Sequence, residues 1–237
     1  MSTSIALVGY GKWGKILNKR LKKFCHVKYI LRSKDNIKKI YGKVKWAVVA
    51  TPDKTHYKIL KKLINAKINI FCEKPLTTSF KTSKKLIQLA KKNKVKMYIS
   101  DIEKFKNKKI KLKKKNFIYR SRKQKIKNYD FLRRLFYHDV YLLYPKLKFE
   151  KIKNIKFLKN LYDIEILIAE RNRIFTFNYV LGKSKSHKIN DVNFMSNKDY
   201  IETMIKKVFS SKVNYKANQL CAINTIKILE KTKNARN

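Results

Sequence analysis

Short apolar runs alternate with helical patterns throughout the first hundred residues. Runs of this kind, bounded by polar residues or glycine, are typical of buried parallel strands. We expect strands at Ile5–Val8, Val27–Leu31, Trp46–Ala50, Asn69–Cys72 and Lys96–Ser100. Apolar residues at helical spacing predict crossover helices after Gly11, over Asn36–Tyr41, after Pro52 and over Phe80–Lys92. This alternation predicts a doubly wound parallel sheet that is covered by helices on both faces.

The pattern changes after Asp101. The stretch Lys104–Lys115 is dominated by lysine and lacks periodicity, so we expect a solvated connection there. Beyond it we predict a helix, three strands of an antiparallel meander, and two closing helices, at Tyr129–Leu143, Ile152–Leu158, Asp163–Ala169, Arg173–Tyr179, Lys198–Phe209 and Ala217–Lys231. The predicted fold class is therefore α/β. A Rossmann domain over residues 1–101 precedes a reduced α+β domain with an open, mostly antiparallel sheet over residues 102–237, whose last helix is a candidate to pack back on the first domain.

Composition places the chain among globular proteins, with 44% hydrophobic residues. No run approaches the roughly 18 to 20 apolar residues of a membrane span, and the short apolar run near the N-terminus does not predict a secretory signal. Three widely spaced cysteines fit neither a disulfide framework nor a metal site. We therefore expect a cytoplasmic protein with no metal and no membrane partner.

The formal net charge of +46 would suit a nucleic-acid binder, but its make-up favours another explanation. Only nine of the 61 basic residues are arginines, the side chain best suited to bidentate contacts with phosphates and bases. Lysine is spread along the whole chain with abundant Asn and Ile, the residues that an AT-rich coding sequence produces. We expect weak, salt-sensitive attraction to polyanions and no specific nucleic-acid partner.

A glycine pattern directly after the first predicted strand indicates a dinucleotide site. Gly9, Gly11 and Gly14 form G-x-G-x-x-G at the start of a predicted helix, and the chain has only five glycines. In this context the first glycine permits the tight turn, the second admits a pyrophosphate and the third allows close helix packing. We expect the cofactor to contact the turn residues Gly9, Tyr10, Gly11, Lys12, Trp13 and Gly14.

The end of the second predicted strand bears on the choice between NAD and NADP. An acidic residue there would hold the ribose hydroxyls of NAD, but the chain has Arg32 and Ser33. A guanidinium and a hydroxyl suit a 2′-phosphate, which favours NADP. Asp35 lies three positions further on and leaves NAD open.

Three motifs in succession resemble the signatures of the Gfo/Idh/MocA oxidoreductases. They are Gly9 to Gly14, then Ala50-Thr51-Pro52 with His56, then Glu73-Lys74-Pro75. The resemblance covers the first hundred residues well, the last forty fairly and the middle poorly. It implies a Rossmann domain followed by an open-faced α/β domain whose sheet often mediates dimerisation, so we expect a homo-oligomer.

The resemblance also implies roles for individual residues. Thr51, Pro52 and His56 would lie along the nicotinamide half of the cofactor, with Glu73 nearby. Lys74 matches the lysine that takes part in proton transfer during alcohol–ketone interconversion. Independently of the family, a lysine at the carboxyl end of a parallel strand faces the crevice where ligands bind.

The sequence contains only one of the two residues that the resemblance implies for the substrate site. His138 resembles the histidine of a helical Asp–His pair in family members that act on nucleotide sugars, but Arg134 stands where the Asp would be, one turn earlier. We expect His138 to orient the substrate and Arg134 to meet an anionic group such as a carboxylate or diphosphate.

These observations predict an NAD(P)-dependent dehydrogenase or reductase. It would transfer hydride to or from a hydroxyl-bearing carbon of a sugar, sugar nucleotide or related small molecule, with Lys74 as proton donor or acceptor. Two alternatives remain open. One is a non-catalytic dinucleotide-binding sensor or scaffold, and the other is an imine or C=X reductase that uses the same cofactor site.

Overall fold

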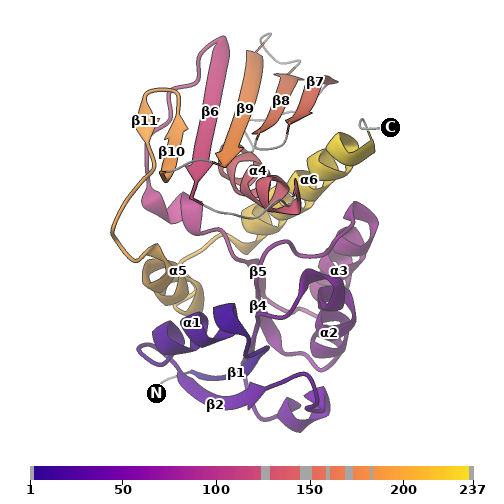
Figure 1. Cartoon of the computed structure of the whole chain (residues 1–237). Helices are drawn as coiled ribbons and strands as arrows, with labels where there is room; N and C mark the ends of the chain where they lie inside the picture. The colour runs from indigo at the N-terminus through magenta and orange to yellow at the C-terminus, as the bar shows by residue number, and fades with distance from the viewer. Residues whose placement is uncertain are drawn as a thin grey trace. The chain divides into compact units, whose positions relative to one another are not determined.

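The computed structural model describes residues 3–123, 129–144, 151–158, 161–168, 173–181 and 184–234 (Figure 1). The chain divides into two compact units. The first contains residues 1–102 and 199–226, and the second contains residues 103–198 and 227–237. Residues 199–226, which the predicted division places in the second domain with a last helix that could pack back on the first, group with the first unit.

A five-stranded parallel sheet forms the centre of the first unit. Its spatial order is β2-β1-β3-β4-β5, the strands being β1 (Ser4–Val8), β2 (His26–Leu31), β3 (Trp46–Val49), β4 (Asn69–Cys72) and β5 (Met97–Ile99). The two central strands β1 and β3 are almost wholly buried because helices cover both faces of such a sheet. Their carboxyl ends, together with that of β4, meet at one edge, where the sequence predicts the cofactor site.

Four helical segments connect these strands: α1 (Lys12–Leu21), the 3-10 helix η1 (Ile37–Ile40), α2 (Asp53–Asn65) and α3 (Phe80–Lys92). Each of the three α-helices is amphipathic and turns its apolar face to the sheet, as Leu17 and Leu21 of α1 illustrate. Ser79 caps α3, because its hydroxyl accepts a hydrogen bond from the Thr82 amide at 3.2 Å.

The last part of the first unit comes from the far end of the sequence. It consists of α5 (Tyr200–Phe209) and the beginning of α6 (Tyr215–Asn234). The Phe209 ring packs edge-on against Trp46 of β3, with centroids 5.1 Å apart. Along the edge strand β5, the Asn218 side chain donates to Ile99 O and accepts from Ile99 N, both at 2.8 Å. The side chain thereby satisfies backbone groups that a sixth strand would otherwise pair.

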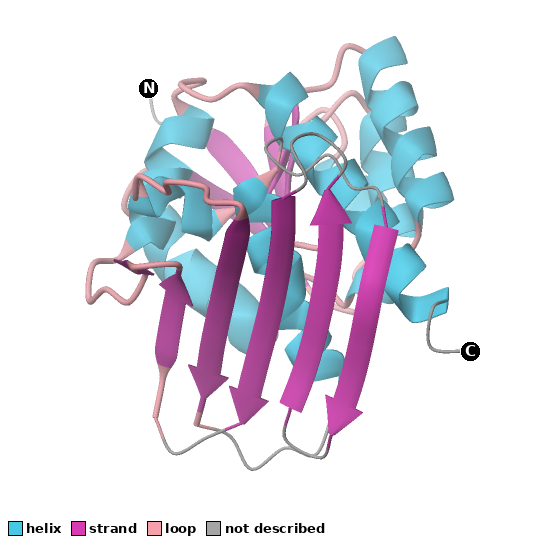
Figure 2. Ribbon diagram, turned by 90° about the horizontal axis from the view of Figure 1, so that it is seen from above, coloured by secondary structure: helices cyan, strands magenta, loops and turns pink. Residues whose placement is uncertain are grey.

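The second unit is built on a six-stranded mixed sheet of order β11-β10-β6-β9-β8-β7 (Figure 2). Its elements are the 3-10 helix η2 (Ile102–Lys106), which joins the units, β6 (Lys115–Arg122), α4 (Tyr129–Leu143), β7 (Lys151–Leu158), β8 (Leu161–Ile168), β9 (Arg173–Leu181), β10 (Ser186–Ile189) and β11 (Val192–Asn193). Strands β7, β8 and β9 form the predicted antiparallel meander, whereas β6 pairs with β9 in parallel. Helix α4 packs on β8 and β9, with Phe136 edge-on to Phe177 at 4.9 Å.

Both the predicted Rossmann fold and the small α+β unit with an open sheet are confirmed, with local differences. We expected only a connection over Lys104–Lys115, but η2 occupies its start and β6 begins at its last residue. Strands β10 and β11 were not predicted. Ala169, the last residue of one predicted strand, lies outside the described residues. No helix in the described part of the chain is both long and apolar enough to cross a membrane.

Candidate cofactor and active site

The turn between β1 and α1 has the geometry of a phosphate-binding loop. Gly9 has a φ of +98°, and a Cβ at this position would lie 2.7 Å from Ala50 O. A Cβ on Gly14 would lie 2.1 Å from Gly9 O, so only glycine lets α1 approach the strand this closely. Each of these two glycines is therefore required by the backbone around it.

Gly11 differs because a Cβ there would meet no atom within 4 Å. It precedes α1, and no side chain caps the helix at this end. The amide groups of the first turn are consequently directed to the space beside Gly11, where they can bind an anion. This open side fits a pyrophosphate, which needs close backbone approach.

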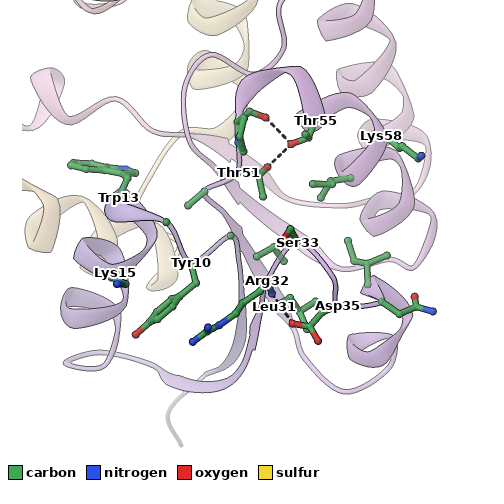
Figure 3. Close-up of a pocket in the computed structure, with 18 of the residues that line it drawn as sticks. Tyr10, Trp13, Lys15, Leu31, Arg32, Ser33, Asp35, Thr51, Thr55 and Lys58 are labelled. Carbon is green, nitrogen blue, oxygen red and sulfur yellow. Dashed lines mark hydrogen bonds between the residues drawn. The ribbon is translucent and has the colours of Figure 1, made fainter.

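A cleft of about 920 Å³ lies in front of this turn, at the carboxyl ends of β1, β2 and β3 (Figure 3). Its volume is in the range of cofactor sites. Nine of the predicted cofactor residues line it: Gly9, Tyr10, Gly11, Lys12, Trp13, Arg32, Ser33, Thr51 and Pro52. Gly14, His56, Glu73 and Lys74 are not among its lining residues.

Cationic side chains dominate the cleft walls. Lysines 12, 15, 58 and 62 and Arg32 all line it, and of the described lining residues only Asp35 is acidic. The Arg32 guanidinium lies over the Tyr10 ring, 5.4 Å from its centroid. This contact holds the guanidinium at the mouth of the cleft, where an anionic group of the cofactor would arrive.

The Asp35 carboxylate is engaged by its own loop. One oxygen accepts from the Arg32 backbone amide at 2.8 Å and the other from Lys39 Nζ at 3.4 Å. The hydrogen bond from the Arg32 amide is the main reason that the pKa of Asp35 is lowered. Asp35 therefore closes the loop after β2 onto the Arg32 amide.

The loop between β3 and α2 forms the opposite wall. The Thr55 hydroxyl lies 2.6 Å from Pro52 O and 2.8 Å from the Thr51 hydroxyl, so it fixes the entry to α2. Figure 3 shows Thr51 and Thr55 directed toward each other beside the cleft. Behind this wall, the His56 ring is buried, and both of its nitrogens lie 2.9 Å from backbone carbonyls, those of Thr51 and Pro75.

Glu73, Lys74 and Pro75 follow β4 directly. The Glu73 amide donates to Val49 O at 2.9 Å, which extends the pairing of β4 with β3 by one residue. Burial raises the pKa of Glu73, although hydrogen bonds from the Trp13 indole and the Ser100 hydroxyl favour its carboxylate. Lys74 is half-exposed and the Lys74–Pro75 peptide is cis.

The predicted substrate residues lie in the second unit. Both are on α4, where Arg134 is exposed and His138 is half-buried. Lys74, in contrast, belongs to the first unit. The next residue on the helix, Asp139, points away from solvent and is completely buried.

Asp139 is the centre of a charged cluster that we did not predict. Its carboxylate accepts two hydrogen bonds from Arg120, at 2.7 and 2.8 Å, and one each from the Tyr179 hydroxyl and His187 Nε2, both at 2.9 Å. Arg120 also pairs with Glu103, 3.2 Å away. We refer to Glu103, Arg120, Asp139, Tyr179 and His187 as the buried cluster.

The charged groups of the buried cluster shift each other's pKa values. Burial alone would raise the pKa of Asp139, but Arg120 and His187 outweigh it and hold the pKa well below its usual range. Burial lowers the pKa of His187, which is therefore neutral near neutral pH. The sequence contains no signal for this cluster, because β6, which carries Arg120, is not predicted as a strand from its residue pattern.

No group of three or more His, Cys, Asp or Glu side chains within the described residues is arranged to hold a metal ion. All three cysteines, Cys25, Cys72 and Cys221, are buried free thiols.

Comparison with known proteins finds similarity in the first unit by sequence and over the whole chain by fold. Residues 14–100 match the family model described as "Oxidoreductase family, NAD-binding Rossmann fold", GFO_IDH_MocA. The sequence matches no curated protein. Among solved structures, UDP-N-acetylglucosamine 3-dehydrogenase GnnA from Acidithiobacillus ferrooxidans superposes with a TM-score of 0.84 at 10% identity, over 98% of this chain and 96% of that one.

Two further structures show the same fold. GenD2 from gentamicin A biosynthesis, solved with NAD, has a TM-score of 0.74 at 13% identity, over 97% of this chain and 92% of that one. The WlbA dehydrogenase from Thermus thermophilus, solved with NAD and UDP-GlcNAcA, has a TM-score of 0.72 at 12% identity, covering 96% and 93%. Taken with the phosphate turn and the parallel sheet, these matches show that residues 14–100 resemble the NAD-binding Rossmann domain of the Gfo/Idh/MocA oxidoreductases and that the chain shares the fold of these dehydrogenases.

Proposed function

We propose that this protein is an oxidoreductase that transfers hydride between a nicotinamide dinucleotide and a hydroxyl-bearing carbon of a sugar, sugar nucleotide or related small molecule. The observation that carries the proposal is the position of Lys74. It is a half-exposed lysine at the carboxyl end of β4, in a unit whose phosphate turn and cleft fit a dinucleotide. Ligands of open parallel sheets bind at this edge.

The cofactor, Lys74 and Glu73 would each have a distinct role in this reaction. When bound, the nicotinamide ring supplies the hydride acceptor or donor. In the oxidative direction, Lys74 would accept the proton of the substrate hydroxyl while the substrate carbon that bears this hydroxyl loses a hydride to the cofactor. In the reductive direction, Lys74 would return a proton to the substrate carbonyl oxygen. Glu73, whose amide donates to Val49 O at 2.9 Å, would hold the Lys74 backbone beside β3.

We further propose that NADP is preferred over NAD. Arg32 and Ser33 both line the cleft after β2, where the adenosine ribose would lie. Asp35, the acidic residue that could hold ribose hydroxyls, already accepts from the Arg32 amide and Lys39. The excess of cations in the cleft also favours a cofactor with an additional phosphate.

For the substrate, we propose that His138 and Arg134 supply the contacts from α4. The exposed Arg134 guanidinium suits a carboxylate or the diphosphate of a sugar nucleotide. WlbA was solved with a sugar nucleotide, UDP-GlcNAcA, which makes this class the first to test.

A cofactor titration tests the proposal most directly. NADPH and NADH are titrated separately and followed by nicotinamide fluorescence, in about 0.3 M salt to screen non-specific attraction of phosphates. We expect saturable binding of both and tighter binding of NADPH, with the preference abolished in Arg32→Ala. Lys28→Ala, the loss of an exposed cation on β2, is the matched control and should bind like wild type. If neither cofactor binds, the proposal is wrong.

A turnover assay then distinguishes catalysis from the sensor alternative. Arg134 in place of the family Asp is the observation that favours a non-catalytic protein. With UDP-GlcNAc, UDP-GlcNAcA and inositol as probes, we expect cofactor reduction by wild type and at least a hundredfold slower reduction by Lys74→Met, with cofactor affinity retained. Tight cofactor binding without turnover on a broader panel of alcohols and imines would favour the sensor.

We also propose a homo-oligomer in the cytoplasm. Within the described residues, no helix covers the face of the second unit's sheet that is turned to the viewer in Figure 2. Phe117 and Tyr119 of β6 are 59% and 39% exposed there, which is typical of an interaction surface. The three free thiols suit a reducing compartment.

A further inference from the structure

Arg122 is a half-buried cation that has no ion-pair partner in the described part of the chain. It is the last residue of β6 and, being two positions after Arg120, lies on the same face of the strand. Among the described residues, the carboxylates of this region pair with Arg120 and Lys106, and none pairs with Arg122. Charged groups that leave water are normally paired, so Arg122 is an exception.

The two carboxylates whose charge acts on Arg122 are already engaged. Asp139 accepts four hydrogen bonds within the buried cluster, which is about the capacity of a carboxylate. The two oxygens of Glu103 pair with Arg120 at 3.2 Å and with Lys106 at 2.8 Å. Both carboxylates are therefore occupied by other partners.

The charges around Arg122 do not balance. Together with Arg122, the ion-paired groups described above comprise the cations Lys106, Arg120 and Arg122 and the anions Glu103 and Asp139. Burial and the neighbouring charge of Arg120 lower the pKa of Arg122, and the two carboxylates do not outweigh them. The surplus is a single positive charge at the half-exposed edge of the buried cluster. An anion bound there would balance that charge and replace the water that the guanidinium has lost.

An anion at Arg122 would lie on the face of the sheet against which α4 packs. Arg120 donates to Asp139 of α4 on this face, and Arg122 follows Arg120 on the same face. Helix α4 also carries the proposed substrate residues, the exposed Arg134 and the half-buried His138, which adjoins Asp139. The planar fork of a guanidinium matches two oxygens of a phosphate or a carboxylate.

We propose that Arg122 is an anion-binding residue of the second unit, which contacts a phosphate or carboxylate group of the substrate from the end of β6. It would supplement Arg134, which approaches the substrate from α4. The identity of the substrate rests on the proposed function, whereas the uncompensated charge of Arg122 does not depend on it.

Ligand titration tests the contact. Wild type and Arg122→Gln are first saturated with NADPH, so that the cofactor cleft is occupied. They are then titrated with UDP-GlcNAc and with UDP-GlcNAcA by calorimetry, in about 0.3 M salt. We expect the dissociation constant to rise at least about tenfold in Arg122→Gln, with the affinity for NADPH unchanged.

The two ligands distinguish the two anionic groups. A loss of affinity for both ligands assigns the contact to the diphosphate, and a loss for UDP-GlcNAcA alone assigns it to the carboxylate. Lys188→Gln, at an exposed site on β10, is the matched control and should bind like wild type. Wild-type affinity of Arg122→Gln for both ligands would overturn the proposal.

Unfolding by urea provides a readout that needs no ligand. Since Arg122 lies near Arg120 without a carboxylate partner, its replacement removes a repulsion and breaks no ion pair among the described residues. We expect the urea midpoint of Arg122→Gln to equal or exceed that of wild type. A lower midpoint would mean that Arg122 supports the fold instead of binding an anion.

The outcomes are distinct from a failure of the proposed function. If wild type loaded with NADPH binds neither nucleotide, the proposed substrate class is wrong, and inorganic phosphate becomes the probe of Arg122. Phosphate, compared with chloride at equal ionic strength, should then raise the urea midpoint of wild type more than that of Arg122→Gln. Equal increases in the two proteins would rule out an anion site at Arg122.

Discussion

The phosphate turn of the first unit and the buried cluster of the second achieve order in opposite ways. In the turn, the decisive atoms are backbone atoms within six residues, and side chains are absent where Gly9 and Gly14 approach Ala50 and each other. In the buried cluster, five polar side chains from η2, β6, α4, β9 and β10 meet around the Asp139 carboxylate. The phosphate turn depends on glycines that have no side chain, whereas the buried cluster depends on the pairing of opposite charges.

This difference has an energetic consequence. A glycine turn has no buried charge, so a substitution there costs only the local steric rearrangement. The buried cluster contains charges that are removed from water, and each is tolerated only while its partners remain. We therefore expect unfolding free energy to be most sensitive in the second unit and cofactor affinity to be most sensitive in the first.

The largest effect should come from Asp139→Ala. The change leaves the Arg120 guanidinium buried with Glu103 alone, and breaking a buried pair in this way costs about 3–5 kcal/mol. We expect the midpoint of urea unfolding to fall accordingly. Asp191→Ala is the matched control, because Asp191 pairs with Lys113 at the surface and its side chain is 82% exposed. If the two variants unfold alike, Asp139 does not hold the buried cluster together.

Acid should weaken the same cluster. The folded-state pKa values of Asp139 and His187 are both lowered, so on acidification the unfolded chain takes up protons before the folded one does. Their stabilisation is complete above the unfolded pKa values and is lost as the pH falls, first near pH 6.5 for His187 and then below about 4 for Asp139. Asp139 alone should account for a loss on the order of 1 kcal/mol by about pH 3, with the remainder at lower pH.

Urea midpoints across this pH range, for wild type and Asp139→Asn, measure that loss. The Asn variant should be less stable at neutral pH and should show a shallower dependence on acid. Parallel curves for the two proteins would mean that Asp139 is not the group responsible.

Gly14→Ala should have a moderate effect on stability. Its new Cβ would meet Gly9 O at 2.1 Å, so either α1 or the turn must move, at a cost of about 1–3 kcal/mol. Because the displaced turn is also the proposed phosphate site, NADPH binding should be lost as well. Thermal unfolding and NADPH titration of the same sample measure both effects.

Gly11→Ala should have the smallest effect on stability and still impair binding. The new Cβ meets no atom within 4 Å, so the cost is limited to a poorer helix cap, less than about 1 kcal/mol. The methyl group would occupy the space proposed for the pyrophosphate, and NADPH affinity should fall at least tenfold. Unchanged affinity in Gly11→Ala would contradict the assignment of this turn.

The same contrast explains what could be predicted from the sequence. The phosphate turn and Glu73-Lys74-Pro75 are local, so neighbouring residues in the sequence are neighbours in space. The buried cluster could not be found this way, because Glu103, Arg120, Asp139 and His187 are brought together only by the tertiary fold.

Strand β6 is a second element that the hydrophobic pattern of the sequence does not predict. Its inward positions include the polar residues Asn116 and Arg120, whereas Phe117 and Tyr119 face outward. The usual rule that apolar residues point to the core is reversed at these positions, so the hydrophobic pattern gave no strand signal. The return of residues 199–226 to the first unit depends on contacts such as Trp46 with Phe209, which sequence spacing does not reveal.

The side chain of Asn218 that closes the edge of β5 has a consequence for biosynthesis. As the ribosome synthesises the chain, β1 to β5 emerge long before residues 199–226. Until Asn218 arrives, Ile99 presents an unpaired amide and carbonyl at an open strand edge, which is a template for association with other nascent chains. The first unit is thus the first to be translated and among the last to be completed.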